Sequence, residues 1–124
     1  MRALFLMPLA LGVSSVAAAQ RSQVRIVEVQ LSSFDFAPST IMLRAGEPIV
    51  LHLVNAGGGG HNFAAPQFFA AATGVSGPVR NGTVEVDSHQ AVDIRLTPAR
   101  GTYRLRCTHT LHSTFGMRGE LVVQ

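Results

Sequence analysis

Residues 107–117 concentrate side chains that bind transition metals. The only cysteine of the chain is followed within eleven residues by two histidines and a methionine, in the order Cys107, His109, His112 and Met117. A thiolate, an imidazole and a thioether together suit copper in both of its oxidation states, whereas zinc has no use for a thioether and calcium or magnesium binds oxygen. A trigonal copper site with an axial methionine takes two histidines, so one histidine is expected from elsewhere in the chain.

Taken singly, these side chains have ordinary explanations. A lone cysteine is most often a small buried hydrophobe, and a methionine most often fills space in a core. Their position argues otherwise, because residues 101–106 alternate as a strand that runs into Cys107 and residues 120–124 form another strand. The intervening residues are therefore expected to form a polar loop between two strands, which favours ligands over core packing.

The glycine-rich segment 56–60 precedes His61 and Asn62. A phosphate-binding loop is disfavoured, because no lysine follows the glycines and no helix start is placed to help. Glycines also let a backbone approach another group closely or adopt positive φ. The segment is expected to bring His61 to a strand end as the missing histidine, although by itself His61 would pass for an ordinary loop histidine.

With His61 included, the pattern resembles that of the cupredoxins, the small blue copper proteins. Their pattern is a histidine followed by asparagine or aspartate, and then a cysteine, a histidine and a methionine on the loop that joins the last two strands. The resemblance implies that one copper ion is bound by four ligands, His61, Cys107, His112 and Met117. Four residues lie in each gap of the loop, a spacing similar to that of plantacyanin. The resemblance covers essentially all of residues 20–124.

The same resemblance implies roles for three residues around the ligands, Gly60, Asn62 and Thr108. Gly60 is expected to offer its carbonyl oxygen to the metal from the side opposite the methionine. Asn62 is expected to tie the two ligand segments together, and its neighbourhood to supply a hydrogen bond to the cysteine sulfur. Such outer contacts orient the ligands and adjust the metal.

The loop histidine has two candidates. His112 is preferred over His109, because a ligand so soon after the cysteine would be out of place in a cupredoxin. The loop departs from the family where Thr110 and Leu111 replace the proline-glycine that often precedes the histidine, and the disulfide of the plant members is absent. His52, in a strand, and His89, in a polar turn, are expected to be structural or solvent-facing.

Residues 1–19 have the features of a secretory signal peptide. Arg2 provides a positive start, residues 3–16 are almost wholly apolar, and three alanines precede Gln20. The apolar run is shorter than the roughly 20 residues that span a membrane. We therefore expect a periplasmic or secreted protein without a membrane span, in which residues 20–124 form one cupredoxin-like domain. Metal coordination would explain an unpaired cysteine in an exported protein.

The mature chain reads as β-structure almost throughout. Strands are expected at residues 24–31, 40–44, 49–55, 82–87, 91–96, 101–106 and 120–124. The second and third of these strands are expected to pair as a hairpin. Residues 66–73, which begin with a proline, are expected to form a short helix. The predicted fold is all-β: an antiparallel sandwich of about seven to eight strands with one short helix, and the resemblance implies Greek-key order.

The distribution of basic residues argues against a nucleic-acid partner. The ten basic residues are all arginines, scattered along the chain, and the net charge is +3. Removal of Arg2 with the signal peptide leaves nine arginines against seven acidic residues. No basic run is present, so nucleic-acid binding is not indicated and the arginines are interpreted as solvated strand faces.

The ligand set favours electron transfer over catalysis. Four protein ligands leave no open position for water, so no enzymatic activity is expected. The predicted function is a monomeric one-electron carrier that meets a redox partner protein transiently. The alternatives are a periplasmic copper chaperone or resistance protein, which would hold copper for a copper-handling partner without shuttling electrons, and a sandwich whose site takes zinc or stays empty.

An apolar patch is the expected docking surface around the His112 ring edge, the expected exit for the electron. Its candidate members are Ala64, Ala65, Phe68, Phe69, Leu111 and Phe115. Core packing is the alternative for the phenylalanines.

Overall fold

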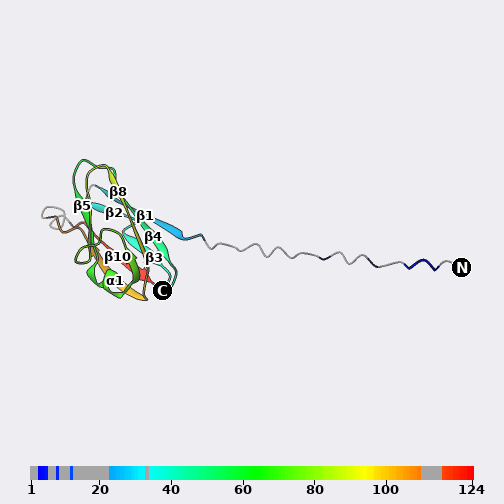
Figure 1. The fold of residues 1–124 in the computed structure, drawn as a ribbon. Helices are drawn as coiled ribbons and strands as arrows, with labels where there is room; N and C mark the ends of the chain where they lie inside the picture. The colour runs from blue at the N-terminus through cyan, green and yellow to red at the C-terminus, as the bar shows by residue number, and fades with distance from the viewer. Residues whose placement is uncertain (1–2, 6–7, 9–11, 13–22, 33, 110–115) are drawn as a thin grey trace.

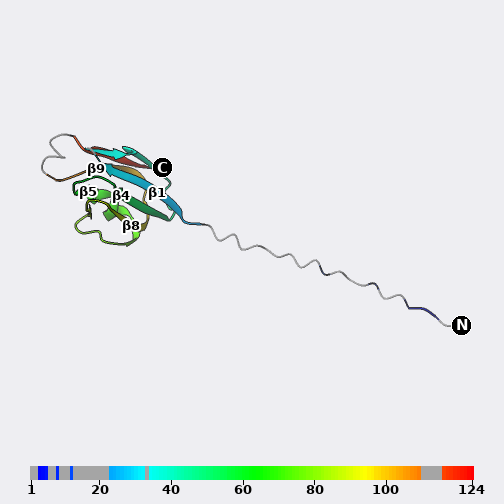
Figure 2. The same cartoon turned by 90° about the horizontal axis from the view of Figure 1, so that it is seen from above.

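The computed structural model describes residues 3–5, 8, 12, 23–32, 34–109 and 116–124. These residues form ten strands and one helix: β1 (Arg25–Ser32), β2 (Asp35–Ala37), β3 (Thr40–Leu43), β4 (Ile49–Asn55), β5 (His61–Ala64), α1 (Pro66–Ala71), β6 (Thr73–Ser76), β7 (Thr83–Val86), β8 (Gln90–Thr97), β9 (Gly101–Arg106) and β10 (Arg118–Val123). The elements are labelled in Figure 1, and Figure 2 gives the same fold from above. One sheet has the order β2-β1-β4-β8-β6 and the other the order β3-β10-β9-β5-β7.

The alternation of buried and exposed residues within β1 shows why this segment folds as a half-buried strand. Val27, Val29 and Leu31 are buried, whereas Glu28 and Gln30 between them are exposed. Successive side chains of a strand point to opposite faces, so this pattern makes one face apolar. Packing that face on a second sheet removes its apolar surface from water.

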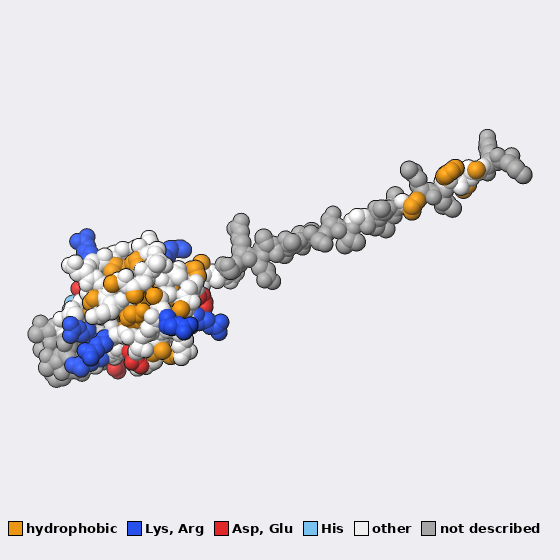
Figure 3. All heavy atoms as spheres, turned by 90° about the horizontal axis from the view of Figure 1, so that it is seen from below, with side chains coloured by type: hydrophobic (Ala, Val, Ile, Leu, Met, Phe, Trp, Pro, Cys, Tyr) orange, Lys and Arg blue, Asp and Glu red, His pale blue; other side chains and the backbone are white. Residues whose placement is uncertain are grey.

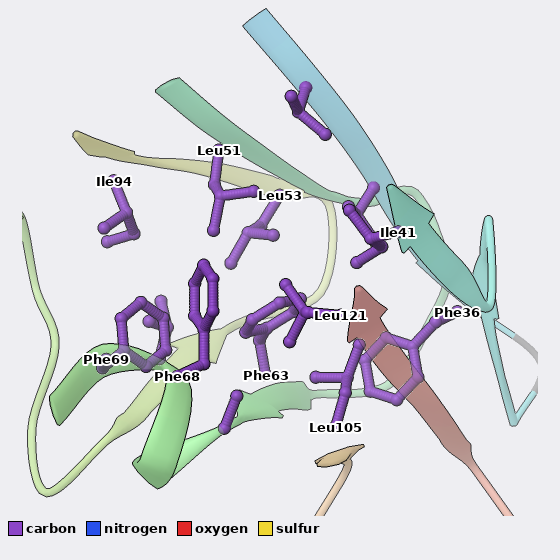
Figure 4. Close-up of a cluster of buried hydrophobic side chains, with 14 of the residues drawn as sticks. Phe36, Ile41, Leu51, Leu53, Phe63, Phe68, Phe69, Ile94, Leu105 and Leu121 are labelled. Atoms are coloured by element: carbon purple, nitrogen blue, oxygen red, sulfur yellow. The ribbon is translucent and has the colours of Figure 1, made fainter. Parts of the chain in front are cut away.

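The core lies between the two sheets and is closed by the helix. Figure 4 shows Leu51, Leu53 and Ile94 of the first sheet facing Phe63, Leu105 and Leu121 of the second, with Phe68 and Phe69 reaching in from α1. The Phe63 ring meets the Phe36 and Phe69 rings edge-on, with centroids 6.0 Å apart in both pairs. Edge-to-face aromatic pairs add to the energy of burial.

The all-β sandwich with one short helix is confirmed, and it holds more strands than the sequence pattern predicted. The three additional strands are β2, β5 and β6. All four residues of β5 are buried, and all four of β6 are exposed. Neither strand therefore has the alternation by which a half-buried strand is recognised, and β2 has only three residues.

The expected hairpin of residues 40–44 and 49–55 is wrong. β3 pairs in parallel with β10, whereas β4 belongs to the other sheet, where it pairs in parallel with β1 and antiparallel with β8. The connection between them is hydrogen-bonded to distant segments: Ala45 N–H donates to the Gln124 carbonyl at 2.8 Å, and Gly46 N–H to the Pro98 carbonyl at 3.0 Å. These bonds carry the chain from one sheet to the other, so the sandwich is not purely antiparallel.

The helix starts at Pro66 as predicted and ends at Ala71, two residues before the predicted end. Ala72 is already extended, with ψ of 157°, and the chain continues into β6. Of the helices in the described part of the chain, none has the length and apolarity needed to cross a membrane. The signal peptide and the domain start at residue 20 stay predictions, because residues 13–22 lie outside the description.

Phe63 is the side chain on which we test the core. Replacing it by alanine removes a fully buried ring that contacts two other rings, so Phe63→Ala is expected to lower the free energy of unfolding by about 3–5 kcal/mol. Chemical denaturation of the metal-free protein measures the change. The control is Ile26→Ala, at a position 68% exposed on β1, which is expected to change stability by no more than about 0.5 kcal/mol. Equal effects of the two substitutions would contradict this core.

Candidate metal centre

Cys107 and Met117 lie at the adjacent ends of two paired strands. β9 and β10 are antiparallel and pair Arg106 with Arg118, so Cys107 directly follows one strand and Met117 directly precedes the other. The pairing extends one step further, because Cys107 N–H donates to the Met117 carbonyl at 3.1 Å. Both side chains are completely buried. Strand pairing therefore places the two sulfur-bearing residues opposite each other.

His61 reaches the same end of this sheet from β5. Ala64 pairs with Arg106 in antiparallel register, so the residues before Ala64 run alongside those after Arg106. His61, the first residue of β5, is only 5% exposed. Three of the four predicted ligands thus gather at one end of three neighbouring strands. The fourth, His112, lies outside the described residues.

Asn62 connects the β5 segment to the segment that follows β9. Its backbone N–H donates to Cys107 Sγ at 3.4 Å. Its side-chain oxygen accepts from Thr108 N–H at 2.8 Å, and its Nδ2 donates to Thr108 Oγ1 at 2.7 Å and to Glu85 Oε1 at 3.0 Å. Asn62 itself is buried whereas Thr108 and Glu85 are exposed, so the loss of these bonds would leave the buried amide without partners, which is costly.

Glu85 joins the same network from β7 and also contacts His109. His109 Nε2 lies 3.0 Å from Glu85 Oε2. Burial raises the pKa of the Glu85 carboxyl, but hydrogen bonds with Asn62 and His109 and the charge of His109 outweigh it, so the pKa lies below its ordinary value of 4.5. His109, the alternative ligand, thus has one ring nitrogen directed at a carboxylate.

The glycine segment before His61 is held by an asparagine that the sequence pattern did not single out. Buried Asn55, the last residue of β4, donates from Nδ2 to the Gly59 carbonyl at 2.7 Å and to the Val86 carbonyl at 3.0 Å. Gly57 N–H donates back to Asn55 Oδ1 at 3.0 Å. Ser88 Oγ donates to the Gly57 carbonyl at 2.6 Å. The segment is therefore fixed between β4 and β7.

The steric explanation of the glycine run needs correction. Glycines 57–60 do not adopt positive φ, and a Cβ added at Gly58 or Gly59 would meet no atom within 4 Å. At Gly60 an added Cβ would lie 3.4 Å from His109 Cε1. Only Gly60 therefore sits beside the region of the ligands, and the path of the segment depends on the hydrogen bonds of Asn55 rather than on glycine conformations.

The expected apolar docking patch is wrong for its described members. Ala64, Ala65, Phe68 and Phe69 are buried, and both phenylalanines belong to the core between the sheets. The alternative of core packing is therefore the right one, because α1 directs its aromatic side chains inward. Leu111 and Phe115 lie outside the described residues.

The other two histidines have the contacts expected of structural or solvent-facing residues. His52 Nδ1 contacts the Asp93 carboxylate across β4 and β8. His89 is exposed in a turn, with a φ of 59°. Asn55, Glu85 and Ser88 contribute contacts around the centre that the sequence pattern missed. Glu85 and Ser88 are distant in sequence from the residues that they contact, so no local spacing signals them. Asn55 bonds to glycines only two and four residues ahead of it, a local asparagine turn that the sequence could have indicated.

The donor set fits copper on the chemistry of its members. Two buried sulfur-bearing residues lie beside a buried imidazole, and a peptide N–H is directed at the cysteine sulfur, as at thiolate metal sites. Within the residues described, no three His, Cys, Asp or Glu side chains converge on a common point. Of the four predicted ligands, only His61 and Cys107 could belong to such a group, because Met117 is of another residue type and His112 lies outside the described residues.

Comparisons with known proteins agree with the fold. A family model described as "Cupredoxin-like domain" matches residues 3–123. Auracyanin B is 24% identical with a TM-score of 0.62, over 81% of this chain and 88% of that chain. Auracyanin A of Chloroflexus aurantiacus, described as a "blue" copper protein, is 17% identical with a TM-score of 0.56, over 80% of this chain and 98% of that chain.

An enzyme shares the same architecture. The multicopper oxidase McoA of Aquifex aeolicus is 17% identical with a TM-score of 0.64, over 83% of this chain but only 30% of the oxidase. Identities this low establish likeness of fold alone. None of the curated proteins matches the sequence significantly.

Removal of the Asn62 side chain tests the link between the two ligand segments. Asn62→Ala removes the hydrogen bonds of this buried side chain to Thr108 N–H, to the Thr108 hydroxyl and to Glu85, so the free energy of unfolding of the metal-free protein is expected to fall by about 1–3 kcal/mol. Thr108→Val is the matched control, because it removes only the hydroxyl and keeps the bond from Thr108 N–H. A loss from Asn62→Ala no larger than the loss from Thr108→Val would contradict the linking role.

The lowered pKa of Glu85 predicts a pH dependence of stability. Because folding lowers this pKa, the ionised carboxylate stabilises the folded state above pH 4.5, and that contribution is lost as the pH falls through the lowered folded value. Native protein is therefore expected to be more stable than Glu85→Gln at neutral pH, with the difference shrinking under acid conditions. Denaturation across pH measures it, with Glu28→Gln on the exposed face of β1 as control. A difference that widens below pH 4.5 would contradict the prediction.

Proposed function

The chain belongs to the cupredoxin-like domain family, and on that premise we propose that it binds one copper ion in a type 1, or blue, site and carries single electrons. The observation that supports this most is the gathering of His61, Cys107 and Met117 at one end of β5, β9 and β10. Auracyanin A, described as a "blue" copper protein, shares the fold.

The proposed ligands are His61, Cys107, His112 and Met117. Thiolate and thioether sulfur favour copper(I), and imidazole binds both oxidation states. Copper held by this set supplies the one-electron couple. The spacing similar to plantacyanin belongs to this proposal, as does the choice of His112 over His109, whose ring nitrogen contacts Glu85 at 3.0 Å.

The protein's own contribution is rigidity and exclusion of water. Pairing of β9 with β10 holds the Cys107 and Met117 backbones opposite each other, and Asn62 N–H donates to the cysteine sulfur. Complete burial of both sulfur-bearing residues keeps solvent away from them. A site fixed in this way rearranges little between oxidation states and offers no place for an attacking water. We therefore propose a carrier rather than an enzyme.

The second candidate function is a copper chaperone or resistance protein. A protein that hands over its metal needs ligands that a partner can reach. Burial of Cys107 and Met117 favours the carrier instead. Measured copper(I) dissociation and electron-exchange rates separate the two, since rapid copper(I) exchange with slow electron exchange would identify the chaperone.

Export is part of the proposal. Residues 1–19 would direct the chain to the periplasm or outside the cell and be removed there, leaving residues 20–124 as a monomer that meets its redox partner transiently. In the exported fraction, mass spectrometry of the intact protein is expected to give the mass of a chain whose first residue is Gln20. Recovery of protein that retains residues 1–19 from that fraction would contradict cleavage.

Copper titration tests the ligand set. Addition of copper(II) to the purified domain is expected to produce a strong absorption band in the orange-red, because thiolate bonded to copper absorbs there, and Cys107→Ser is expected to abolish the band. His112→Ala is expected to lose or alter the band, whereas the matched variant His109→Ala is expected to keep it. Absence of the band in native protein would exclude the carrier function, and the reverse behaviour of the histidine variants would identify His109 as the ligand.

A further inference from the structure

We propose that a groove on the outer face of β9 and β10 docks an acidic patch of the redox partner. The inference rests on the proposed function, because it names the kind of partner for the same centre. The groove has a volume of about 610 Å³ and is lined by Arg104, Arg106, Arg118 and Gln67, with apolar atoms of Ala64 and Pro66 among them. We name it the arginine groove after Arg104, Arg106 and Arg118.

Strand register brings the three arginines to one face. Arg106 and Arg118 are directly opposite each other across β9 and β10. Arg104 lies two residues before Arg106 and so points to the same side of the sheet. All three are exposed, whereas Leu105 between two of them is buried in the core. The inner face of these strands packs on the other sheet, and the outer face presents three arginines against one carboxylate, that of Glu120.

No carboxylate of the described residues neutralises this charge by direct contact. The ion pairs described are between His52 and Asp93 and between His109 and Glu85. Glu120 is exposed on the same face and pairs with Arg104 in register, but the ion pairs found among the described residues do not include it. Figure 3 shows one face of the molecule, with blue arginine side chains in several separate groups and red acidic side chains mainly at its lower edge. The guanidinium groups are thus available to an external anion.

The chemistry of the groove favours carboxylates on a protein surface over one small anion. Each guanidinium presents a planar set of donors that matches a carboxylate in two parallel hydrogen bonds. Arginines at alternate positions of a strand are about 6.6 Å apart, so the groove is spaced for several carboxylates. The exposed ring of Pro66 beside the charges suits a brief protein contact better than a fully hydrated ion.

The position of the groove connects it to the metal centre. Arg106 is covalently joined to Cys107, and Arg118 to Met117. A partner seated on the groove therefore contacts the residues next to two proposed ligands. This charged surface takes the docking role that the buried phenylalanines of α1 cannot fill.

Binding is tested by NMR with a hexaglutamate peptide as the probe. Both the reduced, copper-loaded protein and the metal-free protein are titrated at low salt, with inorganic phosphate as the comparison. The peptide is expected to shift the amides of Arg104, Arg106 and Arg118 and to be released by added salt, because exposed charge pairs are screened. The double variant Arg106→Gln/Arg118→Gln is expected to weaken binding about tenfold.

The matched control removes the same charge from the other sheet. Arg25→Gln/Arg95→Gln lies at exposed positions of β1 and β8 and is expected to leave peptide binding within about twofold of native. Equal weakening by both double variants would show attraction by net charge alone and overturn the groove. Binding of phosphate without binding of the peptide would also overturn a protein-docking surface.

The rate of electron transfer to small oxidants gives a second test of the groove. Oxidation of the reduced protein by anionic ferricyanide is expected to slow severalfold in Arg106→Gln/Arg118→Gln, whereas oxidation by cationic tris(phenanthroline)cobalt(III) is expected not to slow.

Peptide binding at the groove without a copper band would refute the carrier and retain the acidic-partner surface. A normal copper band with no peptide binding would refute the groove and retain the carrier.

Discussion

The pairing of β9 with β10 is the constraint on which the candidate centre depends. It ends in the hydrogen bond from Cys107 N–H to the Met117 carbonyl, at 3.1 Å, so the two sulfur-bearing residues leave the sheet side by side. β5 adds His61 from the adjacent position, and Asn62 N–H meets the cysteine sulfur at 3.4 Å. A sheet resists deformation, so side chains at its strand ends start from fixed positions.

The same two strands carry side chains of three kinds because side chains alternate along them. Leu105 and Leu121 point inward and join the core (Figure 4). Arg104 and Arg106 point outward and line the arginine groove. The residues just beyond the strand ends, Cys107 and Met117, are the sulfur-bearing members of the candidate centre. A register shift of one residue would exchange the first two faces, so the core itself secures the position of both surfaces.

Fold and function are separate conclusions for this chain. Auracyanin A, described as a "blue" copper protein, and a multicopper oxidase both share its architecture at 17% identity. The sandwich therefore does not specify the chemistry, which depends on the side chains at one end of it. Here those side chains include a cysteine and a methionine that are both completely buried, a combination suited to a closed copper site.

The sequence by itself determined the donor types, the all-β class and the strand that leads into Cys107, because donor chemistry and period-two alternation are local properties. Only the tertiary structure decided that β3 and β4 lie in different sheets, that β5 is a strand, and that Glu85 contacts Asn62 and His109 beside the candidate centre. A fully buried strand has no alternation, and hydrogen bonds between distant residues leave no local pattern. Those features depend on which segments meet when the two sheets pack.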